Sequence, residues 1–151
     1  MRIVVKNRQK DLKIASKELK KALASFLEKK NVRCAEVIIH YVTKRSMCQM
    51  HKDYFDDDSA TDCISLPIDS PTDGSPFSIL GEVFVCPKVA IDYAAQHNTD
   101  PHKENLLYTV HGLLHLLGYD DQAAHDRKVM RREERKAMNF LEGICRGQEI
   151  L

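Results

Sequence analysis

Two histidines and an aspartate in the last third of the chain form the pattern with the clearest chemical meaning. The segment at residues 110–121 reads VHGLLHLLGYDD, so His111 and His115 are four residues apart. On a helix, residues four apart project from the same side, about one turn from each other. Two neutral imidazoles in this arrangement are able to bind one divalent cation. The sequence therefore predicts a metal site on this helix.

A third ligand is expected from the segment that follows the helix. Gly118 comes three residues after His115, where a glycine in the left-handed conformation would end the helix and reverse the chain. Asp121, three residues further on, is then placed to supply a carboxylate oxygen. Three protein ligands with one open position are typical of catalytic zinc, so we expect one zinc ion per chain, held by His111, His115 and Asp121. His125, in the expected first turn of the next helix, is the competing third ligand.

Each part of this pattern also has a simpler explanation. Two histidines four residues apart on a helix are common without a metal, and a glycine at the end of a helix often serves only as a C-cap. Zinc peptidases of the HExxH type carry a glutamate after the first histidine as general base, and that position here is Gly112. A peptidase function is therefore disfavoured. The other histidines have no partner by spacing: His40, His51, His97 and His102.

The composition fits one globular domain covering residues 1–151. The chain is 43% hydrophobic and 30% charged, with 6 Gly and 5 Pro, which excludes collagen-like and disordered proteins. No apolar run reaches the roughly 18 residues of a membrane span, and the N-terminus lacks the apolar core of a secretory signal. The 23 basic and 22 acidic residues nearly cancel. Any binding to a polyanion must therefore depend on a local basic patch.

The cysteines are five in number, widely spaced and without a CxxC pair. We expect small buried thiols rather than disulfides or a cysteine zinc site, and a cytoplasmic location. They are Cys34, Cys48, Cys63, Cys86 and Cys145.

The elements that must position the metal ligands form an α+β fold, in which a small mixed β-sheet packs with helices and one zincin-like helix binds the metal. The periodicity of apolar residues and the positions of Pro and Thr predict these elements. Strands are expected at residues 1–6, 35–42, 61–66 and 81–86, and helices at 11–30, 44–54 (capped by Thr43), 87–97, 101–117 and 122–141. A loop rich in Ser, Pro, Asp and Gly occupies residues 69–78.

The last predicted helix carries a basic stripe opposite an apolar face. The stripe is suited to a polyanion such as an RNA backbone. Alternatively it is only a solvated face, in which Glu133 and Glu134 pair with the cations along the helix. Tyr108 and Tyr119 are able to stack on bases near the site, although packing in the core is the expected role of each. The basic residues are Arg127, Lys128, Arg131, Arg132, Arg135 and Lys136.

Two stretches of the sequence resemble the YbeY family of metal-dependent endoribonucleases, which act in the maturation of bacterial ribosomal RNA. HGLLHLLGYDD, at residues 111–121, resembles the family signature HGxLHLxGYDH and departs from it at Asp121, where the family has a third histidine. TDCISLP, at residues 61–67, resembles the family's TDVLSFP strand, and GEVFV, at residues 81–85, resembles the GDI-type strand that follows it. Together with the first strand and the basic last helix, the resemblance covers nearly the whole chain.

This resemblance implies a cytoplasmic zinc protein that cuts single-stranded ribosomal RNA and works with the small ribosomal subunit and its proteins. The metal would polarise a phosphoryl oxygen and activate the attacking water. The general base is unassigned, and Asp62 and Asp120 are the nearby carboxylates.

Two departures from the family pattern favour an alternative, an assembly factor of the ribosome with a structural zinc and little catalysis. Asp121 adds a negative charge to the metal and so makes it a weaker Lewis acid. Phe55 occupies the place of an arginine that the family usually carries, which leaves the phosphate contact to other cations. Lys44 and Arg45 are the candidate substitutes.

Overall fold

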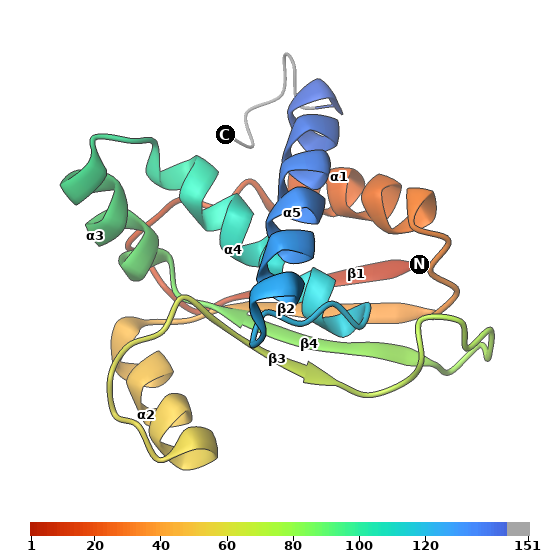
Figure 1. Cartoon of the computed structure of the whole chain (residues 1–151), viewed down its shortest axis with the longest axis horizontal. Helices are drawn as coiled ribbons and strands as arrows, with labels where there is room; N and C mark the ends of the chain where they lie inside the picture. The colour runs from red at the N-terminus through yellow and green to blue at the C-terminus, as the bar shows by residue number, and fades with distance from the viewer. Residues whose placement is uncertain (145–151) are drawn as a thin grey trace.

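A four-stranded sheet is the platform on which the helices pack. The computed structural model describes residues 1–144. The strands are β1 (Arg2–Asn7), β2 (Glu36–Tyr41), β3 (Cys63–Pro67) and β4 (Ile79–Val85), in the order β1-β2-β4-β3. β1, β2 and β4 run parallel to one another, and β3 runs antiparallel to β4. The prediction of a small mixed sheet in an α+β fold is confirmed (Figure 1).

The described residues also form five helices, which fall close to the predicted ranges. They are α1 (Ser16–Lys29), α2 (Lys44–Phe55), α3 (Pro87–His97), α4 (Pro101–Leu116) and α5 (Ala124–Ile144). The predicted cap of α2 is confirmed, because the hydroxyl of Thr43 accepts a hydrogen bond from the backbone N–H of Ser46. None of these helices combines the length and the apolar character that crossing a lipid bilayer requires.

The start of α1 is the largest departure from the predicted boundaries. The helix begins at Ser16 rather than at residue 11. The side-chain amide of Gln9 explains the difference, because it accepts a hydrogen bond from the N–H of Leu12 (2.9 Å) and donates one to the carbonyl of Leu12 (2.8 Å). These two bonds satisfy the backbone of Leu12 outside a helix while its side chain stays buried.

α4 lies at the centre of the molecule. Figure 1 shows α1, α4 and α5 on one side of the sheet and α2 on the other. α4 contacts β3, β4, α3 and α5, so it is buried on more than one side. Its buried residues include Tyr108, Thr109 and Leu116.

The cysteines of the described residues are all free thiols. Cys34 and Cys86 are buried, whereas Cys48 and Cys63 are half-buried, so the prediction of buried thiols is met at two of these four positions. Cys145 lies outside the described residues.

Gly112 brings α4 into direct contact with the sheet, one residue after the first predicted metal ligand. A Cβ atom at this position would overlap Cγ1 of Val83 on β4 and lie 3.1 Å from Oγ of Ser65 on β3. The hydroxyl of Ser65 donates a hydrogen bond of 2.8 Å to the carbonyl of Gly112. The absence of a side chain therefore sets the distance between α4 and the sheet.

We expect Gly112→Ala to lower the free energy of unfolding by roughly 1–3 kcal/mol, because the added methyl group must displace Val83 in a close-packed contact. Urea denaturation measures the change. Gly143→Ala, in α5, is the matched control, since within residues 1–144 only the backbone of its own helix and its chain neighbours lie near the added Cβ. It should leave stability unchanged or raise it by up to about 1 kcal/mol. A Gly112→Ala protein as stable as the wild type would contradict the close approach.

Candidate metal centre

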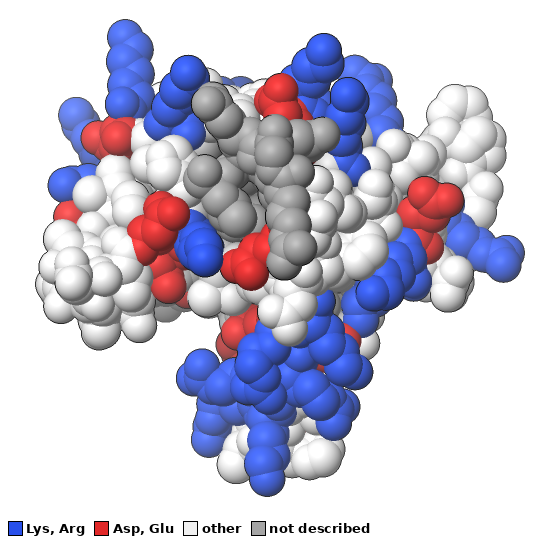
Figure 2. Space-filling model, turned by 90° about the horizontal axis from the view of Figure 1, so that it is seen from above, with Lys and Arg blue, Asp and Glu red and all other residues white. Residues whose placement is uncertain are grey.

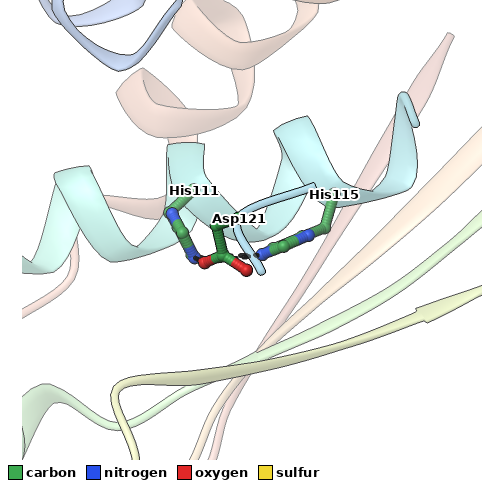
Figure 3. Close-up of side chains that lie close together, drawn as sticks. All are labelled: His111, His115 and Asp121. Carbon is green, nitrogen blue, oxygen red and sulfur yellow. Dashed lines mark hydrogen bonds and ion pairs between the residues drawn. The ribbon is translucent and has the colours of Figure 1, made fainter. Parts of the chain in front are cut away.

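The three predicted ligands converge where α4 ends and the chain turns back. His111 and His115 project from one side of α4 (Figure 3). Gly118 has a φ of 101°, the left-handed conformation predicted for it, and its N–H donates to the carbonyl of His115 (3.0 Å). The reversal brings Asp121 back beside the two imidazole rings.

The distances among the donor atoms fit one divalent cation. Nε2 of His111 lies 3.1 Å from Nε2 of His115, and Oδ2 of Asp121 lies 3.3 Å and 3.5 Å from these two atoms. Ligands about 2.0–2.1 Å from a tetrahedral zinc ion are separated from one another by about 3.3 Å. His125 is exposed at the start of α5 and does not join this group among the described residues.

Glu134 on α5 forms a hydrogen bond with the first histidine, at the ring nitrogen that does not face the other two ligands. Its Oε1 accepts a hydrogen bond of 2.7 Å from Nδ1 of His111, and its side chain is only 15% exposed. A carboxylate on Nδ1 fixes the proton there and leaves the lone pair of Nε2 for a metal ion. The alternative in which Glu134 pairs with cations along its own helix is therefore wrong.

The role of Glu134 was missed in the sequence, although the sequence contains a signal for it. At about 100° per residue, Glu134 falls on the same face of α5 as Met130, Ala137 and Leu141, which are buried. An acidic residue on an apolar helix face needs a polar partner from another element. The sequence could have revealed the need, but not that the partner is His111.

The electrostatics of His111 favour a cation at this site. Burial of the ring opposes its charged form, but the hydrogen bond to Glu134 and the charges of Glu134, Asp62 and Asp121 outweigh burial and raise the pKa of His111 above its usual value. The surroundings thus stabilise positive charge on the imidazole side of the site. A metal ion competes with a proton for Nε2, so its binding should weaken as the pH falls.

A cleft of 660 Å³ opens beside His111 and Asp121, bounded by α3, α4, α5 and the segment before β3. Of the two candidate general bases, Asp62 lines the cleft, whereas Asp120 is exposed and accepts a hydrogen bond from the N–H of Asp121. Tyr108 also lines the cleft. Tyr108 is also part of the buried core and Tyr119 packs against it, as expected for both.

The cations proposed as substitutes for the family arginine do not line this cleft. Lys44 pairs with Asp92 of α3 at 3.3 Å, and Arg45 is exposed on α2. Phe55, at the end of α2, is 60% exposed. The arginines that line the cleft, Arg127 and Arg131, come from α5.

Along most of its length the chain is similar to proteins described as endoribonuclease YbeY. The sequence model of the family with that description matches residues 4–142. The endoribonuclease YbeY of Protochlamydia amoebophila is 45% identical over 138 residues, covering 91% of each chain. That of Chlamydia felis is 38% identical over 144 residues, covering 93% of this chain and 91% of the relative. The solution structure of TM1509 from Thermotoga maritima shares the fold, with a TM-score of 0.67 at 23% identity over 98% of this chain and 94% of that one.

We expect Glu134→Gln to weaken metal binding by about 10- to 100-fold, because the uncharged amide no longer polarises the Nδ1–H of His111. Competition with a chromophoric zinc chelator measures the affinity. Glu133→Gln is the matched control: Glu133 pairs with Lys30 at 2.7 Å and does not touch the ligands. It should lower stability and leave metal affinity unchanged. Equal metal affinities in the two variants would refute the supporting role of Glu134.

Proposed function

We propose that this chain, which belongs to the endoribonuclease YbeY family, cleaves single-stranded RNA with one zinc ion held by His111, His115 and Asp121. Membership of the family makes the chain a hydrolase that acts on RNA. The observation that carries the rest is the triangle of donor atoms, 3.1–3.5 Å on a side, at the edge of the cleft. In this proposal residues 1–151 act as one RNA hydrolase domain.

The donor set favours zinc over harder cations. Two imidazole nitrogens and one carboxylate oxygen are usual ligands of zinc, whereas magnesium and calcium prefer oxygen ligands alone. Asp121 contributes a negative charge, which lowers the Lewis acidity of the ion relative to a site of three neutral histidines. Three protein ligands also leave one coordination position for substrate or water, as in catalytic rather than structural zinc sites.

Residues around the metal ligands would supply the other functions of catalysis, namely proton transfer and positioning of a ligand. When bound, the ion supplies Lewis acidity that polarises a phosphoryl oxygen and makes water a better nucleophile. Asp62 is the proposed proton acceptor, because it lines the cleft. Its Oδ1 accepts hydrogen bonds from the N–H of Cys63 (2.8 Å) and the hydroxyl of Thr61 (3.2 Å), which hold the carboxylate in place and leave Oδ2 for a proton. Glu134 keeps the proton of His111 on Nδ1.

The biological setting follows from the family resemblance. We propose that the substrate is ribosomal RNA, processed in the cytoplasm during maturation of the small ribosomal subunit and in contact with its proteins. The basic face of α5 supports an RNA partner, because its cations are exposed. A peptidase role is disfavoured further by the contact of Gly112 with the sheet, which leaves no room for the glutamate that such enzymes carry at this position.

His111→Ala and His115→Ala should each abolish both stoichiometric zinc and RNA cleavage, because two remaining ligands do not hold the ion. Elemental analysis of the purified proteins gives the metal content, and a labelled single-stranded RNA gives the cleavage rate. Chelation should inactivate the wild type, and added zinc should restore it. Undiminished cleavage by thoroughly metal-free wild type would exclude this mechanism, and full zinc content without cleavage would favour the assembly-factor alternative.

Asp62→Asn should lower kcat by about 100-fold or more while the zinc content stays at that of the wild type, since the amide keeps the Oδ1 acceptor but cannot take up the proton. Asp120→Asn is the matched control, because Asp120 is exposed and lies outside the cleft lining. Its kcat should remain near that of the wild type. Equal rates for Asp62→Asn and wild type would remove Asp62 from the mechanism.

A further inference from the structure

The charged residues of α5 that are fully exposed are all basic, although the helix contains four acidic residues. Glu133 is buried and bonded to Lys30 (2.7 Å), Glu134 is turned toward His111, and the other two are half-buried. In Figure 2 the Lys and Arg side chains gather on one projecting part of the molecule, on the side where Figure 1 places α5 in front. The exposed charged residues of α5 are Arg127, Lys128, Arg131, Arg132, Arg135 and Lys136.

Three of these arginines follow a groove that begins at the metal ligands. Arg127, Arg131 and Arg135 are four residues apart, so they lie along one side of α5 with about 6 Å between successive positions. Arg127 and Arg131 line the cleft at the metal centre. Arg131 and Arg135 line a second hollow of 320 Å³, which shares Leu107 and Glu134 with the cleft. The two hollows therefore adjoin along α5.

These guanidinium groups are available to an anionic ligand. Within the described residues, no carboxylate lies within 4.0 Å of the side-chain nitrogens of Arg127, Arg131 or Arg135. On the neighbouring side of α5, Arg132 and Lys136 lie 4.0 Å and 3.6 Å from the carboxylate of Glu133. The cations on one side of the helix, Arg132 and Lys136, are therefore partly neutralised by Glu133. The arginines on the other side, along the groove, have no such acidic partner among residues 1–144.

The charges of the cleft make these arginines necessary for any polyanion that reaches the metal. Four carboxylates line the cleft: Asp62, Glu104, Asp121 and Glu134. They would repel a phosphodiester unless cations on the same wall offset them. The planar guanidinium of arginine binds the oxygens of a phosphate through two parallel hydrogen bonds, which a lysine cannot provide.

We propose that Arg131 and Arg135 bind successive phosphates of a single RNA strand and lead that strand to the metal centre. This inference rests on the proposed function. The spacing of about 6 Å along the helix suits neighbouring phosphates of an extended strand. Tyr93, which lines the same cleft and is 41% exposed, offers a ring on which an unpaired base can stack, and this favours RNA over an acidic protein segment. Arg127 donates a hydrogen bond to the carbonyl of Gln122, next to Asp121, and so also supports the ligand turn.

The test compares two double variants of the full-length protein that remove the same charge from the same helix. Arg131→Gln with Arg135→Gln removes the two groove cations, whereas Arg132→Gln with Lys136→Gln removes two cations from the side near Glu133. Arg127 is left intact because its loss would disturb the ligand turn. Fluorescence anisotropy of a labelled oligouridine, with metal-free protein in chelator, reports binding without cleavage over a series of KCl concentrations.

The groove variant should raise the Kd about tenfold or more, because it loses two charge-assisted phosphate contacts. The slope of log Kd against log salt should fall by about 1.4, or roughly 0.7 for each phosphate contact in a single strand. The control variant should change the Kd by about threefold or less. Replacing Arg131 and Arg135 by lysine should retain the salt slope, and with zinc-loaded enzyme the glutamine variant should raise KM far more than it lowers kcat.

Equal weakening in the two double variants would overturn the groove and show a diffuse electrostatic surface. Tighter binding of polyglutamate than of oligouridine, lost in the groove variant, would overturn RNA as the occupant. Circular dichroism melting curves check that the exposed substitutions leave the fold intact. If the groove variant binds RNA more weakly than the control variant but the wild type does not cleave RNA, the proposed function is refuted and the groove is supported. If the wild type cleaves RNA but the two variants bind it equally well, the groove is refuted.

Discussion

The hydrogen bond between Glu134 and His111 is the interaction on which the rest of the site depends. It joins α5 to α4 at the first metal ligand, with 2.7 Å between Oε1 and Nδ1. It fixes the tautomer of the imidazole, and so it decides which nitrogen faces Asp121 and His115. The same bond turns an acidic side chain of α5 inward. The metal centre and the basic outer surface of α5 are therefore two consequences of one orientation of this helix.

A second constraint is the close approach of α4 to the sheet. Gly112 allows the backbone of the metal-binding helix to lie against Val83 and Ser65, and the adjacent His111 is bonded to Glu134 of α5. Because the helix is buried on several sides, its histidines cannot move far without disturbing the core. The turn at Gly118 adds the third ligand from the same short segment. The geometry of the site is thus set by helix packing and by this turn.

The features that could be predicted from the sequence are those that act over a few residues. The spacing of His111, His115, Gly118 and Asp121 is such a feature, since helix periodicity and a left-handed glycine suffice to bring the ligands together. The succession of helices and strands along the chain and the α+β class also follow from local apolar patterns, with errors of a few residues at the ends of elements. The late start of α1 could not be predicted from apolar periodicity, because it depends on one side chain, Gln9, that competes with the helix for backbone hydrogen bonds.

Interactions between distant residues account for what the sequence did not reveal. Lys30 and Glu133 are 103 positions apart, and His111 and Glu134 are 23 apart and on different helices. Each pairing uses a glutamate that helix periodicity alone would assign to the cations of α5. Because both acids face inward, α5 separates its charges: Glu134 points to the metal ligands and Glu133 to Lys30, whereas the bases lie on the outer face of the helix. A polyanion meets the basic face first, and it reaches the carboxylates of the cleft only where arginines and a bound cation offset them.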